Sequence, residues 1–155
     1  MTGPVVSNAS PLIALDQIGQ LALLELLFQQ ILVPSAVVSE TTPPLALPTW
    51  IIEKPLSKPL DPRTLATGLG SGEREAMALA LELNAAWIVL DDRAARNFAQ
   101  KLGIPVIGTL GVLLAGKRHG YISAVLPHLD TLKAKGFFIS QELYDLVRIG
   151  AGEEP

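Results

Sequence analysis

The chain of 155 residues is long enough for one compact domain with a single hydrophobic core, and we expect that domain to span residues 1–150, followed by a short tail at 151–155. Apolar residues make up 49% of the chain and charged residues 17%, which excludes a disordered protein. The absence of cysteine excludes disulfide frameworks, thiolate metal sites and cysteine nucleophiles. The net charge of −3 excludes nucleic-acid binding through overall basicity, so contact with a polyanion would need a local basic patch or a bound cation.

The sequence carries no signal for export or for a membrane. It begins Met-Thr-Gly-Pro-Val-Val, without the positively charged start of a secretory leader. Charged or amide side chains interrupt each long apolar window, and the lack of cysteine fits a reducing compartment. We therefore expect a cytoplasmic protein without a membrane span.

The first forty residues are predicted to alternate between short strands and helices. The expected strands are Pro4–Ser7 and Ile31–Val33, and the expected helices are Pro11–Ile18, Leu21–Phe28 and Pro34–Glu40. Ser10 followed by Pro11 is typical of an N-cap and the first helical residue. The helix over Leu21–Phe28 is apolar on more than one face, which predicts either core packing or a homodimer interface.

The rest of the chain continues this alternation after a proline-rich segment. Pro43–Pro62 contains six of the 12 prolines and is predicted to be loop, with one strand at Trp50–Ile52. The expected helices beyond it are Glu73–Leu83, Asp92–Leu102, Thr109–His119, Ala124–Lys135 and Ser140–Ile149, and the expected strands are Ala86–Leu90 and Ile104–Ile107. Short apolar strands alternating with helices predict an α/β fold, a three-layer α/β/α sandwich around a central parallel sheet.

Polar and acidic residues follow the predicted strands or begin the predicted helices. They are Asn8, Glu40, Glu73, Asp91 and Asp92. In open parallel sheets, ligands bind at the carboxyl ends of the strands. Carboxylates gathered there would repel one another, and a hard divalent cation with oxygen ligands, Mg²⁺ or Mn²⁺, would relieve that repulsion. Such a site activates water and stabilises the charge that develops during phosphodiester cleavage.

Each of these residues also has a purely structural explanation. Glu73 in the first turn of a helix would complement the helix dipole, and Asp92 would serve as an N-cap. Glu40 would be a solvated charge at a helix end, and Asn8 an ordinary turn residue. Asp91 is harder to explain as a cap, since one helix needs only one. Composition and spacing therefore make a metal site plausible without establishing it.

The order of the motifs resembles that of PIN domains over most of the chain. The resemblance rests on five segments: Val5–Leu15, Val33–Glu40, Gly70–Ala76, Ile88–Arg93 and Pro105–Leu113. The first four resemble the acidic motifs of that family, and the fifth is similar to the strand and helix that follow in an uncharacterised PIN-like subfamily. No single motif is specific, but the ordered set is.

The resemblance implies a Mg²⁺- or Mn²⁺-dependent endoribonuclease acting on single-stranded RNA. Many PIN domains are VapC-like toxins that form homodimers and are masked by a small antitoxin, so both partners are expected here. The metal-binding acids implied by the resemblance are Glu40, Glu73 and one or both of Asp91 and Asp92. The position of the strand end leaves the choice between Asp91 and Asp92 open.

The sequence departs from the family pattern at Asn8, where PIN domains carry an aspartate. An amide oxygen can bind a metal but lacks the negative charge, so metal affinity should fall and catalysis with it. The alternative is therefore a weakened or inactive PIN-like module that binds RNA or a protein partner.

Basic residues beside the acidic segments are candidates for binding RNA phosphates. Arg93 and Arg96 follow Asp91 and Asp92 directly, and Ser10 lies two residues after Asn8. The two arginines could equally form a solvated helix face. We expect Ser10, Arg93 and Arg96 to contact RNA.

Overall fold

The computed structural model describes residues 3–43, 45–65 and 68–154; Pro44 of the proline-rich segment and Pro155 of the tail lie outside them. The described strands are β1 (Val5–Ser7), β2 (Ile31–Val33), β3 (Ile51–Glu53), β4 (Trp87–Val89) and β5 (Val106–Ile107). The described helices are α1 (Ala9–Gln17), α2 (Ala22–Phe28), α3 (Ser35–Thr41), α4 (Ser71–Leu83), α5 (Arg93–Lys101), α6 (Thr109–Arg118), α7 (Leu126–Ala134) and α8 (Gln141–Ala151), with a 3₁₀ turn at Pro62–Thr64.

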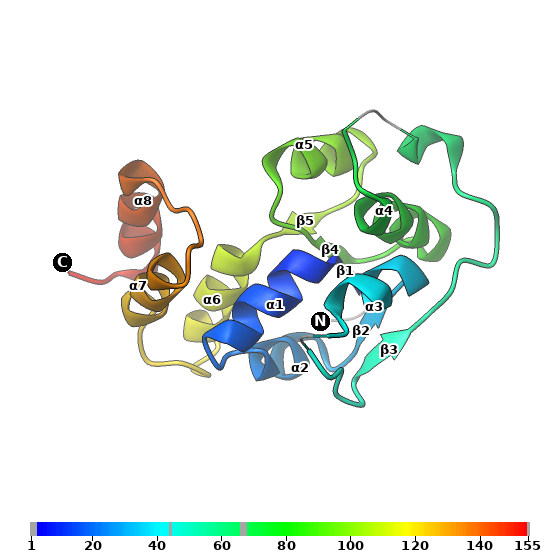
Figure 1. The fold of residues 1–155 in the computed structure, drawn as a ribbon. Coiled ribbons are helices and arrows are strands. Elements are labelled where there is room, and N and C mark those ends of the chain that lie inside the picture. Colours follow the sequence, from blue (N-terminus) through cyan, green and yellow to red (C-terminus); the bar gives the residue numbers. More distant parts are fainter. Residues whose placement is uncertain (1–2, 44, 66–67, 155) are drawn as a thin grey trace.

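The strands form one parallel sheet in the order β3-β2-β1-β4-β5. Helices cover both faces, with α4 and α5 on one side and α1, α2 and α6 on the other, while α7 and α8 lie at one end beside α6 (Figure 1). The prediction of a three-layer α/β/α sandwich is confirmed.

The core lies where the central strands meet these helices. β1 is buried along its whole length, because β2 and β4 flank its edges and helices cover both faces of the sheet; its central residue Val6 pairs with Leu32 and Ile88. A strand buried on both faces should carry an apolar run rather than an alternating pattern, and the sequence of β1 and β4 fits that rule. The largest side chains with essentially no exposed surface are Leu12, Leu15, Leu23, Leu24, Ile31, Met77, Leu79, Ile88, Leu90, Leu113, Leu129 and Leu132.

Helix α2 is a core helix within the chain. Leu23, Leu24, Leu27 and Phe28 are buried, while Leu26 is 51% exposed. Packing inside the domain therefore accounts for four of its apolar side chains, and the homodimer interface stays a prediction. No single helix among the described residues is long and apolar enough to cross a bilayer; α1 and α2, bent by 119° relative to each other, meet that criterion only as a pair.

Three helix starts, those of α1, α4 and α7, lie two residues from their predicted positions. The N-cap of α1 is Asn8, with an extended backbone, so Ser10 and Pro11 fall inside the first turn. Proline is tolerated there because the N–H groups of the first turn have no partner within the helix. Helix α4 begins at Ser71 instead of Glu73, and α7 begins at Leu126 instead of Ala124.

Candidate active site

The order of the strands reverses between β1 and β4, and this reversal sets the position of the candidate site. The chain runs outward from β1 to β2 and β3, then returns to β4 on the other side of β1 and continues to β5. The carboxyl ends of strands at such a reversal form a crevice in open α/β sheets. Asn8 follows β1, and its backbone N–H donates to the carbonyl of Val89 at the end of β4, with 3.0 Å between N and O. Asp91 lies two residues beyond that carbonyl.

Asn8 is buried at this edge, with 5% of its surface exposed. Its side-chain oxygen Oδ1 has no hydrogen-bond partner among the described residues, and the side chain does not cap α1 although the residue is its N-cap. A buried amide oxygen without a donor costs free energy unless a donor or a cation satisfies it. Asn8 thus places an amide oxygen at the carboxyl edge of the sheet that no described donor satisfies.

Glu40 and Glu73 both lie at the start of α4. Glu40, near the end of α3, accepts a hydrogen bond from the backbone N–H of Gly72, with 3.1 Å between N and Oε1. Glu73 accepts one from the N–H of Gly70, with 3.0 Å between N and Oε1. The positive end of a helix dipole attracts carboxylates, and here it attracts two from different parts of the chain. The structure thus brings Glu40 and Glu73, 33 positions apart in sequence, to one helix start.

A second carboxylate contact fixes how α3 and α4 pack. Glu75 of α4 accepts a hydrogen bond from the N–H of Ala36 in the first turn of α3, with 3.0 Å between N and Oε1. Since Glu40 lies near the end of α3 and Gly72 near the start of α4, the two helices run antiparallel. Each helix start is therefore stabilised by an acid from the other helix, and this exchange holds Glu40 beside Glu73.

Asp91 binds the start of α6. Its Oδ1 accepts from the backbone N–H of Thr109 at 2.8 Å, and its Oδ2 accepts from the Thr109 hydroxyl at 2.6 Å. Burial raises the pKa of Asp91 above its usual value; the two hydrogen bonds from Thr109 and the nearby charge of Arg96 lower it, but by less. The carboxylate also lies so close to Gly108 that a side chain there would meet Oδ1 at 2.9 Å.

The two neighbouring aspartates have different surroundings. Asp92 is exposed and is the N-cap of α5, where its Oδ2 accepts from the N–H of Ala95 at 2.9 Å. Asp91 is the acid held at the end of β4, against α6. Asp91 follows β4 at the reversal of strand order, whereas Asp92 caps the helix that leaves this edge, and which of the two binds a metal stays a prediction.

The basic residues expected near the acids occupy α5. Arg93 is exposed and Arg96 half-buried, and neither side chain forms an ion pair or hydrogen bond with another described residue. Ser10 is exposed in the first turn of α1, next to Asn8. A third arginine, Arg74, follows Glu73 in α4, and its buried Nε has no partner among the described residues.

The donor types at this edge fit Mg²⁺ or Mn²⁺, which prefer carboxylate and amide oxygens. The residues that would hold the cation are Asn8, Glu40, Glu73 and Asp91, and the unpartnered oxygen of Asn8 is the feature that matches it best. In the arrangement seen over residues 3–43, 45–65 and 68–154, no three histidine or acidic side chains converge on one point. Each of the candidate acids instead accepts a hydrogen bond at a helix start.

Sequence reasoning missed Arg74, Glu75 and Thr109 as parts of this region. Glu75 and Thr109 bind the partners described above through contacts 39 and 18 positions apart in sequence, and a linear pattern gives no signal for such contacts. The one available signal is the pair Asp91 and Asp92, because the helix that follows needs only one of them as its N-cap. Asp92 caps that helix, α5, and Asp91 instead binds the start of α6.

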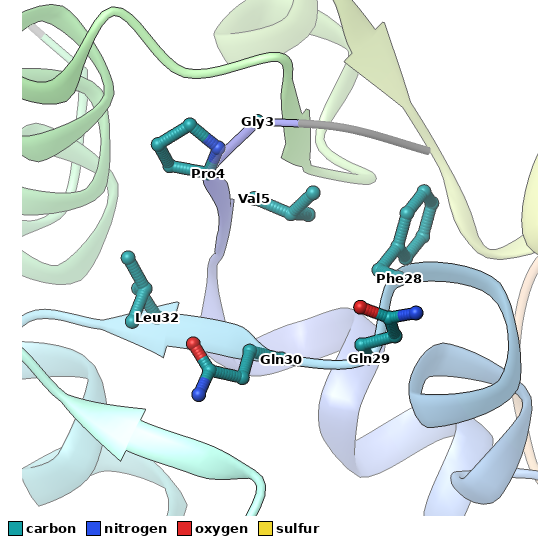
Figure 2. Close-up of a pocket in the computed structure, with 7 residues that line it drawn as sticks. All are labelled: Gly3, Pro4, Val5, Phe28, Gln29, Gln30 and Leu32. Carbon is teal, nitrogen blue, oxygen red and sulfur yellow. The ribbon is translucent and has the colours of Figure 1, made fainter.

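The opposite edge of the sheet carries a cavity of about 690 Å³. Figure 2 shows its lining from the start of β1 (Gly3, Pro4 and Val5) and from the turn between α2 and β2 (Phe28, Gln29 and Gln30), with Leu32 below. Gln29 has φ of 70° and ψ of −49°, and the N–H of Gln30 donates to the carbonyl of Phe28 at 2.8 Å, which is a classic γ-turn. The lining offers no charged group, so this cavity is not the acidic site.

A family model described as a PIN domain matches residues 4–153. The match spans nearly the whole chain, including both edges of the sheet and all the acids described above. Neither the curated proteins nor the solved structures that were compared gave a significant match.

Proposed function

The chain belongs to the PIN-domain family, a nuclease-type fold, and from that premise we propose that it is a Mg²⁺- or Mn²⁺-dependent endoribonuclease that cleaves single-stranded RNA at the carboxyl edge of its sheet. The observation that carries the proposal is the buried, unpartnered oxygen of Asn8 at the reversal between β1 and β4. A cation held by that oxygen would satisfy it, and Glu40, Glu73 and Asp91 would supply the charge that Asn8 lacks.

Glu40 and Glu73 would give up their present hydrogen bonds to bind the cation. Glu40 is exposed and Glu73 half-buried, and their present hydrogen bonds join them to the same turn of α4. Asp91 is more firmly held, because both of its oxygens are bound by Thr109. A bound divalent cation would supply an activated water and charge stabilisation at the phosphodiester. Asp91 would fix the position of the cation, and Glu40 and Glu73 would supply its remaining carboxylate ligands.

The arginines of α5 would hold the substrate. Neither arginine forms a salt bridge with a described residue, although the charge of Arg96 lies near Asp91, and both would bind phosphates. Asp92 would act through them, because as the N-cap of α5 it fixes the first turn that carries Arg93. This local basic surface would attract RNA even though the net negative charge of the chain repels it.

A catalytically silent binding module is the second candidate, and two observations favour it. Asn8 stands where the family resemblance implies an aspartate, and every candidate acid is already used at a helix start. In that case the acids are structural, and the basic surface of α5 binds RNA without cutting it. A small antitoxin and a second copy of the chain remain proposed partners of either version.

Cleavage of a mixed single-stranded RNA pool in Mn²⁺ separates the two candidates. The enzyme is expected to cut RNA as wild type and to cut faster as Asn8→Asp, because the added charge raises metal affinity. If only Asn8→Asp cuts, the site is right and the binding module is the correct function. If neither protein cuts RNA, the nuclease proposal is wrong.

A further inference from the structure

A pocket of about 600 Å³ lies between α5 and the segment that leads into α8. We call it the α5–α8 pocket. Its wall from α5 is polar and its wall from the other side is apolar: the first is formed by Arg93, Arg96 and Asn97, the second by Phe138, Leu143 and Leu146. Asp91 also lines it, so the pocket continues directly from the proposed cleavage site. The volume falls in the range of small-molecule sites, about 300–1,000 Å³.

Phe138 is the most exposed of the exposed large apolar residues in the described chain, at 86%. Its backbone is nevertheless fixed from both sides. The N–H of Phe137 donates to the carbonyl of Leu132 at 3.0 Å, and Ile139 is buried at 6% exposure. Ser140 then caps α8 by accepting from the N–H of Leu143 at 3.1 Å. A bare aromatic ring is thus presented from an anchored segment, which lowers the entropic cost of stacking against it.

The charges across the pocket select the kind of ligand. Arg93 and Arg96 line the pocket and form no salt bridge with a described side chain, although the charge of Arg96 lies near Asp91, and Glu142 on the α8 side is the second acid of the lining. A ligand that is anionic along one side and flat and aromatic on the other matches this pairing. A nucleotide has that character, since its phosphate suits arginine and its base suits an aromatic ring and nearby amides.

We infer that the α5–α8 pocket is a subsite for one unpaired nucleobase of the RNA, stacked on Phe138, with the adjoining phosphate on Arg93 and Arg96. The inference rests on the proposed function, because Asp91 joins the pocket to the cleavage site. It extends that function by assigning to Phe138 the role of positioning the RNA. Stacking tolerates every base, so the subsite positions RNA rather than reading its sequence.

A second copy of the chain is the rival occupant, because Leu146 and Ile149 on α8 are 67% and 65% exposed. An interface between copies would use the apolar stripe of α8. Arg93 and Arg96 of the pocket would add no attraction to such an apolar contact, whereas they attract the phosphates of RNA. Charge complementarity therefore favours RNA.

The test is binding of a fluorescein-labelled oligouridylate, followed by anisotropy in EDTA so that no cleavage occurs. Phe138→Ala is expected to weaken binding about 5- to 100-fold, and Phe138→Trp to restore it. Ile149→Ala is the matched control, since Ile149 is a similarly exposed apolar residue of α8 that does not line the pocket. An abasic oligonucleotide should bind wild type and Phe138→Ala equally.

Three results would overturn the inference. Unchanged affinity of Phe138→Ala for the oligouridylate, while wild type cleaves RNA in Mn²⁺, would remove the subsite and leave the nuclease intact. An equal loss of affinity for the abasic oligonucleotide would exclude stacking. A change in sedimentation with Phe138→Ala, without a change in RNA affinity, would assign the pocket to an interface between copies.

Discussion

The carboxylate of Glu40 lies directly against the α-carbon of Gly72, so closely that any side chain at position 72 would overlap it. The backbone N–H of Gly72 donates to this carboxylate at 3.1 Å between N and Oε1. Position 72 therefore requires glycine, because only glycine leaves room for the Glu40 carboxylate at the start of α4.

Gly72→Ala should displace Glu40 without unfolding the protein. The methyl group removes the hydrogen bond to Glu40, while alanine inside a helix gains about 0.5–1 kcal/mol over glycine. These effects offset each other, so we expect the free energy of unfolding to change by less than about 1 kcal/mol. Cleavage of RNA in Mn²⁺ should fall at least about 10-fold, the loss expected when a metal ligand is misplaced.

Gly150→Ala is the matched control for that change. Gly150 is exposed in α8, and a methyl group there would come no closer than 4.0 Å to Leu114. This variant should be more stable by about 0.5–1 kcal/mol and should keep full activity. Full activity in Gly72→Ala as well would show that the contact between Glu40 and Gly72 is structural only.

Asp91→Asn should change how stability depends on pH. Burial raises the pKa of Asp91 in the folded state, so the protonated carboxyl is favoured there relative to the unfolded chain. The contribution of Asp91 to stability is therefore fully present below its unfolded pKa and is lost as pH rises through its folded pKa. Asparagine does not titrate, so the stability of wild type relative to Asp91→Asn should be greatest in acid and fall as pH rises. Urea unfolding at several pH values measures this difference.

A difference with the opposite slope would mean that the hydrogen bonds from Thr109 outweigh burial. Asp92→Asn provides the control, because Asp92 is an exposed N-cap and asparagine is an equally good one. That variant should match wild type at neutral pH and retain cleavage, whereas Asp91→Asn should lose it.

The sequence pattern predicted most of the fold because apolar runs and turn residues act locally. The apolar run of β1 and the spacing of the leucines in α2 indicate directly which type of element forms and that it is buried. Each element lies within a few residues of its expected place. The exceptions are helix starts. Asn8 replaces Ser10 as the N-cap of α1 because the cap is set by where β1 ends, between β2 and β4, and not by the best capping residue nearby.

The site could be predicted in part only, for a physical reason. The strand ends identify Asn8 and Asp91 because parallel strands bring their carboxyl ends together. The hydrogen bonds of Glu40 with Gly72 and of Glu75 with Ala36 depend on the antiparallel packing of α3 and α4, which no local pattern encodes. The exposure of Phe138 could not be predicted for the same reason, since an aromatic residue is expected in the core unless the tertiary structure shows it on the surface.

Glu153 should stabilise the end of the chain in a pH-dependent way. It accepts from the N–H groups of Val125 at 2.7 Å and Leu126 at 3.0 Å, at the start of α7, and pairs with Lys117 at 2.8 Å. Burial raises its pKa, but the hydrogen bonds from Lys117, Leu126 and Val125 together lower it below the usual 4.5. Its contribution is thus present above the unfolded pKa and is lost as pH falls through the folded one.

Glu153→Gln should lower the free energy of unfolding at neutral pH by about 1–3 kcal/mol. The NH₂ group of the glutamine would face the N–H of Val125 or of Leu126, and the ion pair with Lys117 would be lost. The loss of stability in acid should become shallower. Its exposed neighbour gives the control, and Glu154→Gln should stay within about 0.5 kcal/mol of wild type. Equal effects of the two substitutions would contradict the assigned role.

The central claim is that Asn8, Glu40, Glu73 and Asp91 hold a divalent cation, and its most direct test is the Tm of the protein during a Mn²⁺ titration. A ligand that binds the folded state raises Tm with its concentration. Wild type should show a saturable rise, Asn8→Asp a larger rise at lower Mn²⁺, and the double variant Glu73→Gln/Asp91→Asn none. An unchanged Tm in wild type and in Asn8→Asp, or an equal rise in the double variant, would show that these residues do not form a metal site.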